Sequence, residues 1–173
     1  GRATSIHGTS VFQATQLTGK DESGQEIDIG QVGQVDHCLT EEVLYALSSR
    51  LVPVISPLGR HKESGKTHNI NADLAAAALA CALKPAKLVY LSDVPGLLSD
   101  PEDQSSLIES VTGDEAKDLI AAGTISGGMI PKITSALEAL ESGVEKVHFI
   151  DGRMPHTLLL EIFTKSGIGT EIR

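Results

Sequence analysis

The chain has 173 residues, of which 40% are hydrophobic and 21% charged, as in an ordinary folded domain. Its 14 Lys and Arg residues against 23 Asp and Glu residues give a net charge of −9, and only 3% of the residues are aromatic. General nucleic-acid binders need a basic footprint or a base-stacking platform, so we expect no nucleic-acid partner. No apolar run is long enough to predict a membrane span.

The two cysteines, Cys38 and Cys81, are far apart and form no CxxC pair. This pattern does not indicate a disulfide framework and favours a reducing, cytoplasmic location. The six histidines show no spacing typical of a zinc site, so we expect no metal site built from protein ligands alone. The chain begins with Gly1 instead of Met, which suggests that it is not a whole gene product.

The first half of the chain reads as strands with few helices. Residues 1–38 are polar and rich in glycine, with apolar residues alternating between glycines, which predicts strands and hairpins. Thr40 is a suitable cap for a helix over 41–47. The apolar run 51–57 predicts a buried strand, and the polar segment 59–66 predicts a loop or hairpin.

The middle of the chain is rich in alanine and leucine. Asn71 or Asp73 is expected to begin a helix that extends to Leu83. Residues 87–92 predict a strand because they are apolar and end in a Pro-Gly turn, and 99–106 predict a polar loop.

Helices and strands continue to alternate toward the C-terminus. Asp114 is expected to cap a helix that stops at Gly123. A Gly-rich turn then leads into a second helix, which Gly143 ends. Residues 146–150 predict a strand, Pro155 is expected in the first turn of the next helix, and 168–172 predict a short last strand.

Because helices alternate with strands over residues 40–163, the chain is predicted to be α/β. A mainly parallel open sheet with helices on both faces makes a three-layer αβα sandwich, and we expect one domain over residues 1–173. Ligands bind at the carboxyl ends of strands in such sheets. This rule points to 92–98, 151–153 and the loop after Ile55.

Two polar segments lie where such a sheet binds ligands. Asn69, Asn71 and Asp73 alternate along an extended segment, so they could face one cavity. The alternative is that Asn71 or Asp73 only caps the following helix. In residues 91–98, proline and glycine bend the chain and expose backbone groups to a ligand, with a plain turn as the alternative.

A third polar segment, 123–132, contains consecutive glycines that enter a helix. A helix N-terminus favours an anion, and glycines let the backbone approach it closely. Lys132 lies in the first turns of this helix, where a positive charge opposes the helix dipole. Contact with an anionic ligand explains that position, and an ordinary solvated lysine is the alternative.

Four strings taken together resemble the amino-acid kinase family, and within it the acetylglutamate kinases. The strings are Asn-Ile-Asn-Ala-Asp (69–73), Leu-Ser-Asp-Val-Pro-Gly (91–96), Gly-Thr-Ile-Ser-Gly-Gly-Met-Ile-Pro-Lys (123–132) and Asp-Gly-Arg-Met-Pro-His (151–156). The tail 167–170 also fits, so the resemblance covers about residues 25–173. It implies transfer of the γ-phosphoryl group of ATP to the side-chain carboxylate of N-acetyl-L-glutamate in arginine biosynthesis, with Mg²⁺ held mainly by the nucleotide phosphates.

The resemblance also implies roles for individual residues. Lys132 is implied to stabilise the transferring phosphoryl group, Asp73 to orient the catalytic lysines, and Asn69 to bind acetylglutamate. The implied nucleotide-binding residues are Asp93, Val94, Pro95, Gly96, Leu97, Leu98, Thr124, Ile125 and Ser126. Members that arginine inhibits hold this effector near the last strand and helix, where His148, Glu161 and Gly167 are the implied residues.

The chain departs from the family at its start. It has no lysine beside a glycine pair near the first strand, no His-Gly-Gly-Gly loop and no substrate-carboxylate arginine string. The chain therefore resembles the C-terminal, ATP-binding lobe alone, and we expect negligible kinase activity without the N-terminal substrate lobe. A complete protein of this kind is expected to form a homo-oligomer.

Two other functions remain open. One is a non-catalytic, kinase-like module that senses arginine or serves regulation, and the other is a different amino-acid kinase. Lys132, Asp73 and Asn69 together favour the enzyme, because a pure sensor does not need all three.

Overall fold

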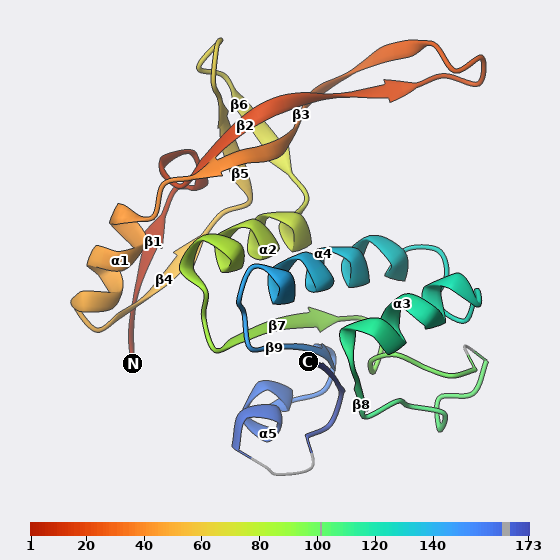
Figure 1. The fold of residues 1–173 in the computed structure, drawn as a ribbon. Coiled ribbons are helices and arrows are strands. Elements are labelled where there is room, and N and C mark those ends of the chain that lie inside the picture. The colour runs from red at the N-terminus through yellow and green to blue at the C-terminus, as the bar shows by residue number, and fades with distance from the viewer. Residues whose placement is uncertain (101, 164–166) are drawn as a thin grey trace. The chain divides into compact units, whose positions relative to one another are not determined.

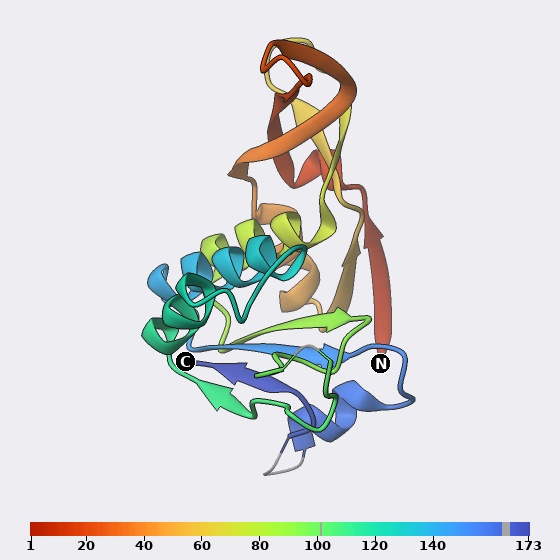
Figure 2. The ribbon, with the colours of Figure 1, turned by 90° about the vertical axis from the view of Figure 1, so that its right-hand side faces the viewer.

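The structure, a computed structural model, describes residues 1–100, 102–163 and 167–173. The chain divides into two compact units, an N-terminal unit of Gly1–Leu83 and a C-terminal unit of Lys84–Arg173. Figure 1 and Figure 2 show the path of the chain through each unit.

Strands dominate the N-terminal unit, as residues 1–38 predicted. Strands β2, β3, β6 and β5 form a closed barrel, and β1 pairs in parallel with β4. The predicted hairpin at 59–66 is confirmed, because β5 and β6 pair antiparallel across it. The elements are β1 (Arg2–Ile6), a 3-10 helix (Gly8–Ser10), β2 (Phe12–Lys20), β3 (Glu26–Cys38), α1 (Glu41–Ser48), β4 (Leu51–Ile55), β5 (Leu58–His61), β6 (Thr67–Ile70) and α2 (Ala72–Leu83).

A small apolar core holds the N-terminal unit together. Gly59 allows the barrel to close, because a Cβ atom there would lie 2.7 Å from Ala14 Cβ and 2.6 Å from Ile70 Cδ1. Strand β5 can therefore pair closely with β2. The buried residues of this core are Ile6, Val11, Phe12, Ala14, Val43, Ala46, Ile70 and Ala75.

Strand β4 differs from its prediction in one respect. It is a strand, but it is not buried, since Val52 is 59% exposed and Val54 is 57% exposed. Side chains alternate along a strand, so Leu51 and Ile55 pack against the core while the two valines point to the opposite face. Nothing in the described part of this unit covers that second face.

The C-terminal unit is a three-layer αβα arrangement, and the predicted α/β class is confirmed. Its sheet has the order β7-β9-β10-β8, with β7 parallel to β9, β10 parallel to β8, and β9 antiparallel to β10. Helices α3 and α4 cover one face and α5 covers the other (Figure 2). The elements are β7 (Lys87–Ser92), β8 (Ser110–Val111), α3 (Gly113–Ala121), α4 (Met129–Glu141), β9 (Lys146–Asp151), α5 (Thr157–Phe163) and β10 (Thr170–Ile172).

The central strands of this sheet are fixed against α4 by aromatic packing. Tyr90 of β7 stacks on Phe149 of β9 with ring centroids 4.9 Å apart. The Tyr90 hydroxyl is hydrogen-bonded to Ser135 Oγ of α4 at 3.0 Å, so its polar end is satisfied inside the core. Ile133 of α4 is fully buried.

The helix caps only partly match their predictions. Asn71 caps α2, because its Oδ1 accepts hydrogen bonds from two backbone N–H groups of the first turn. Thr40 precedes α1 but has helical φ and ψ angles and makes no side-chain cap bond. The expectation for Asp114 is wrong, because Thr112 caps α3 in a reciprocal capping box with Glu115.

Helix α5 begins later than expected. The sequence predicts Pro155 in the first turn of this helix, but the helix starts at Thr157. His156 has a φ of +64°, a left-handed conformation that separates the proline from the helix. Among the described residues, no helix combines the length and apolar character needed to cross a bilayer.

Candidate functional site

The segment after β7 is fixed in place by a buried threonine. Thr170 of β10 is fully buried, and its Oγ1 accepts a hydrogen bond from Leu97 N at 2.8 Å and donates one to Ile108 O at 2.6 Å. Gly96 has a φ of +153°, and a Cβ atom there would lie 2.5 Å from Thr170 Oγ1. The Pro-Gly bend of the sequence thus brings the backbone against β10, where a side chain at residue 96 has no room.

Two of the predicted nucleotide segments meet at a pocket of about 170 Å³. The first follows β7 at the carboxyl edge of the sheet, and the second is the turn before α4. Both were expected to bind the same ligand, and the structure brings them together. The residues that line the pocket are Val94, Gly96, Leu97, Leu98, Thr124, Ile125, Ser126 and Met129.

This pocket is mainly apolar, so it suits a flat apolar group such as a nucleotide base. Asp93 and Pro95 belong to the same segment but do not line it. Met129 lines it and was missed from the sequence. Its position directly after the glycine pair, as the first residue of α4, is the signal that could have identified it.

Lys132 is half-buried and lies on α4, three residues after Met129. Residues three apart on a helix are neighbours on one face, so Lys132 lies next to the pocket-lining methionine. The N-terminus of α4 carries the partial positive charge of the helix dipole, and Gly127 and Gly128 leave its approach open. A cation, a helix N-terminus and an apolar pocket therefore lie next to one another.

Asn69 and Asp73 belong to the N-terminal unit. Asn69 is exposed on β6, where it alternates with the buried His68 and Ile70. Asp73 is half-buried in the first turn of α2. Of the three polar residues that alternate here, Asn71 is the one that caps the helix, so the capping alternative accounts for that residue alone.

A tight ion pair follows β9 at the same sheet edge. Asp151 accepts hydrogen bonds from Arg153 Nε at 2.9 Å and Arg153 Nη2 at 2.7 Å, and a third from the Arg153 backbone N–H. These bonds hold the pKa of Asp151 down to about 2. The turn is also tied to β7, because Gly152 N donates to Ser92 O at 2.8 Å.

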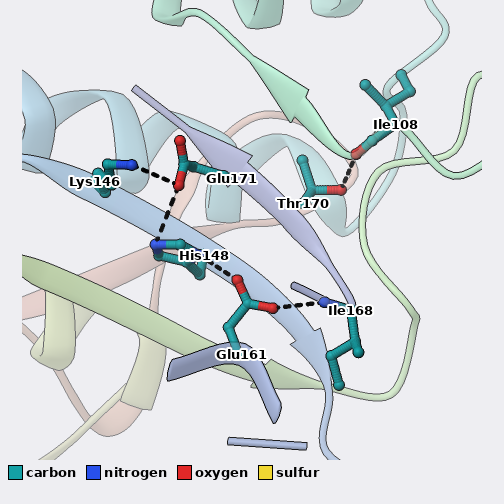
Figure 3. Close-up of polar contacts among 7 residues, drawn as sticks. All are labelled: Ile108, Lys146, His148, Glu161, Ile168, Thr170 and Glu171. Carbon is teal, nitrogen blue, oxygen red and sulfur yellow. Dashed lines mark hydrogen bonds and ion pairs between the residues drawn. The ribbon is translucent and has the colours of Figure 1, made fainter. Parts of the chain in front are cut away.

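The three residues expected to bind an effector share a second cavity, of about 380 Å³. Its lining residues come from β7, β8, β9, β10 and α5, and Figure 3 shows some of the polar side chains around it. Its lining is strongly charged and has both signs. The lining residues are Lys87, Glu109, Ser110, Lys146, His148, Glu161, Gly167, Gly169, Glu171 and Arg173.

Buried Glu161 links three elements around this cavity. Its Oε1 lies 2.5 Å from His148 Nδ1, and its Oε2 accepts a hydrogen bond from Ile168 N at 2.8 Å (Figure 3). Gly167 has a φ of +59°, and a Cβ atom there would lie 3.0 Å from Glu161 Oε2. The glycine is therefore needed where the chain passes the carboxylate.

The other nitrogen of His148 faces a second carboxylate. His148 Nε2 is buried, has no hydrogen-bond partner among the described residues, and lies 3.9 Å from Glu171 Oε2. Lys146 Nζ donates to the same oxygen at 2.9 Å. Burial raises the pKa of Glu171, but the hydrogen bond from Lys146 and the charges of the groups around it, Lys146 first, together leave that pKa below its usual value.

Over the described ranges, no three His, Cys, Asp or Glu side chains lie close enough to hold a metal ion. Within the described residues neither Cys38 nor Cys81 takes part in a disulfide, and both are half-buried. Cys38 is partly buried against the core of the N-terminal unit, and this burial raises the pKa of its thiol to about 11.

Comparison with curated proteins finds acetylglutamate kinases. The chain is 60% identical over 172 residues to the acetylglutamate kinase of Akkermansia muciniphila. The matched region covers 99% of this chain and 58% of that protein. The chain is 48% identical over 166 residues to the acetylglutamate kinase of Methanobrevibacter smithii, at 96% and 56% coverage. The chain therefore spans little more than half the length of these relatives.

Solved structures give the same picture of the fold. An N-acetylglutamate synthase from Neisseria gonorrhoeae, complexed with coenzyme A and N-acetyl-glutamate, is similar with a TM-score of 0.83 and 32% identity over 99% of this chain and 37% of that one. An isopentenyl phosphate kinase from T. acidophilum has the same fold, with a TM-score of 0.63 over 99% of this chain and 60% of its own, at 21% identity. The model of the amino acid kinase family matches residues 7–151, and the chain belongs to that family.

Proposed function

We propose that this chain forms the ATP-binding part of an acetylglutamate kinase, which transfers the γ-phosphoryl group of ATP to the side-chain carboxylate of N-acetyl-L-glutamate in arginine biosynthesis. The pocket between the segment after β7 and the N-terminus of α4 carries the proposal. The 60% identity to a named acetylglutamate kinase supports the choice of substrate.

In this proposal, the apolar pocket holds the adenine base, and the phosphates extend toward the N-terminus of α4. Phosphoryl transfer leaves little covalent work for a protein and depends on positioning and on neutralising charge. Lys132 supplies a mobile positive charge, one helical turn from Met129, for the transferring phosphoryl group. The backbone N–H groups of the Gly-rich turn add partial positive charge at the same place.

The residues present fit a magnesium ion that is held by the nucleotide. Mg²⁺ usually keeps several waters and binds one or two carboxylates together with substrate phosphates. The described residues build no three-ligand protein site, whereas Asp93 is an exposed carboxylate at the start of the nucleotide segment. When bound, the ion would offset the negative charge of the phosphates.

Asn69 and Asp73 are proposed to act on the substrate side. The Asn69 amide is exposed at the end of β6 and can donate to or accept from acetylglutamate. Asp73 is proposed to orient the catalytic lysines, because a carboxylate beside a lysine keeps it protonated and aimed.

Substitution of Lys132 tests the catalytic assignment. In a protein that also carries the N-terminal lobe, Lys132→Ala should lower kcat by about 10²–10³, the usual effect of losing one group that stabilises transition-state charge. Titration calorimetry should show ATP affinity changed by less than about threefold, because the lost contact forms mainly in the transition state. Unchanged turnover would refute the role, and Lys117→Ala on exposed α3 is the control.

The chain alone is proposed to be a poor kinase. Incubation with ATP and acetylglutamate, with hydroxylamine to trap an acyl phosphate, should yield no hydroxamate above background. Robust hydroxamate formation by the purified chain would contradict the assignment of the chain to one lobe.

The charged cavity supports a second function, binding of arginine as an effector. Glu161 and Glu171 can face a guanidinium, and Lys87, Lys146 and Arg173 can face a carboxylate. The N-acetylglutamate synthase of Neisseria gonorrhoeae has also been solved with coenzyme A and L-arginine, at a TM-score of 0.81. Calorimetry with arginine against citrulline, which lacks the guanidinium charge, tests the idea, and absence of any arginine heat would remove it.

We also propose a cytoplasmic location, where thiols stay reduced, because neither cysteine takes part in a disulfide within the described residues. Homo-oligomer formation by the complete protein is likewise a proposal, which sedimentation at several concentrations would test.

A further inference from the structure

We propose that Arg153 is a nucleotide-positioning residue, whose guanidinium offsets the negative charge at the carboxyl ends of β7 and β9 and so admits a polyphosphate to that edge. This inference rests on the proposed nucleotide site.

The first step is the way in which the guanidinium is held. Asp151 is the buried end of the pair, with its side chain 11% exposed, whereas the side chain of Arg153 is 61% exposed. A guanidinium has five N–H donors, and Asp151 takes those on Nε and Nη2. Asp151 therefore holds the guanidinium on one side. The remaining N–H donors of Arg153 lie on its exposed side chain.

The second step is the position of the pair beside the predicted nucleotide segment. Strands β7 and β9 are parallel neighbours, and Ser92 pairs with Asp151 at their carboxyl ends. The hydrogen bond from Gly152 N to Ser92 O joins the two turns just beyond. Asp93 directly follows Ser92, so its carboxylate belongs to the same edge of the sheet. The hydrogen bond to Asp151 and, to a smaller degree, the charge of Asp93 raise the pKa of Arg153.

The third step is the charge at this edge. This edge carries the carboxylates of Asp93 and Asp151 and the guanidinium of Arg153, so the three groups have a net charge of −1 and would have −2 without Arg153. ATP brings further negative charge to the same edge. The screening length is about 10 Å at ordinary ionic strength. Without Arg153, the two carboxylates should therefore repel the phosphates even where they make no direct contact with them.

The test compares ATP with adenosine, which binds the same pocket but carries no phosphate. Both are titrated into the whole 173-residue chain in wild-type form and in the variants Arg153→Ala, Arg153→Lys and Lys117→Ala. The last variant removes a charge from exposed α3, outside this group. Thermal melts without nucleotide check that each variant folds.

Arg153→Ala should weaken ATP binding about tenfold and adenosine binding less than about twofold, because only ATP meets the added repulsion. Arg153→Lys keeps the positive charge but loses the paired N–H donors of the guanidinium. Because the charge is what admits the phosphates, the ATP affinity of this variant should stay within about threefold of wild type. Lys117→Ala should change the affinity for neither ATP nor adenosine. The ATP effect of Arg153→Ala should also shrink at high salt.

Equal losses of ATP and adenosine affinity would overturn the proposal, since that result means a structural role. A lysine variant as poor as the alanine variant, or an alanine variant as good as wild type, would also overturn it. Failure of the wild-type chain to bind either ligand would instead refute the proposed nucleotide site, and this inference with it.

Discussion

At the scale of single residues, Glu161 is the most constrained polar group around the charged cavity. One carboxylate oxygen faces His148 Nδ1 and the other accepts from Ile168 N, in a side chain that is only 5% exposed. A carboxylate can serve both donors, whereas an amide offers only one acceptor oxygen. This residue was expected from the sequence to contact an effector, but its structural contacts within the chain could not be foreseen.

We expect Glu161→Gln to lower the free energy of unfolding by about 1–3 kcal/mol, because one buried donor loses its partner. Urea denaturation followed by circular dichroism measures this. Glu145→Gln is the matched control, since Glu145 is exposed, and it should change stability by less than about 0.5 kcal/mol. A Glu161→Gln variant as stable as the control would mean that the buried contacts contribute nothing.

The pair of Asp151 and Arg153 makes a pH-dependent contribution to stability. The pKa of Asp151 is about 2 in the folded chain, below the ordinary value of 3.8 for an aspartate. The ionised form is therefore favoured by folding, so its contribution is complete above pH 3.8 and is lost as the pH falls toward 2.

Asp151→Asn should accordingly be less stable than wild type at pH 5, and the difference should shrink between pH 4 and pH 2. Denaturant midpoints of both proteins at pH 5, 3 and 2 give the comparison. A difference that stays constant down to pH 2 would show that the charge of Asp151 is not what stabilises the turn.

At the scale of elements, the segment that follows β7 depends on a glycine. A Cβ atom at Gly96 would lie 2.5 Å from Thr170 Oγ1 and 2.9 Å from Leu107 Cδ1, and the φ of +153° is strained for any other residue. The segment would have to move away from β10, and the pocket wall would move with it. Gly128 is a contrasting position at the start of α4, where nothing lies within 4 Å and φ is −67°.

Gly96→Ala should therefore lower ATP affinity by at least about tenfold and reduce stability by about 1–3 kcal/mol. Gly128→Ala should leave stability unchanged or slightly higher, because alanine is the better helix former. Calorimetry with ATP and a thermal melt of each variant distinguish the two. An ATP affinity of Gly96→Ala equal to that of the wild-type chain would indicate that the segment after β7 does not shape the nucleotide pocket.

Local signals predicted most elements of the C-terminal unit. Strand β7 and helix α4 follow directly from apolar runs, helical spacing and glycine stops. The cap of α3 was missed although the Thr112–Glu115 spacing marks it, because Asp114 is an equally good capping type. The two-residue strand β8 could not be predicted, since it exists only through its pairing with β10.

At the scale of the whole molecule, the unpredicted features are those that depend on distant partners. The closed barrel of the N-terminal unit needs β2 to pair with β5 and β3 with β6, and no local pattern specifies such pairing. The exposure of one face of β4 could not be predicted for the same reason, because exposure depends on which other elements cover a strand. The nucleotide segments were identified as motifs, but their convergence on one pocket with Met129 is a tertiary fact.

The central claim is that the C-terminal unit of this chain binds an adenine nucleotide at the pocket between the β7 segment and α4. Photolabelling with 8-azido-ATP, followed by mass-spectrometric mapping of the modified peptides, tests it most directly. We predict adducts in peptides that contain residues 94–98 or 124–129, and we predict that unlabelled ATP suppresses them. Labelling that ATP does not suppress, or ATP-protected labelling confined to residues 1–83, would contradict the claim.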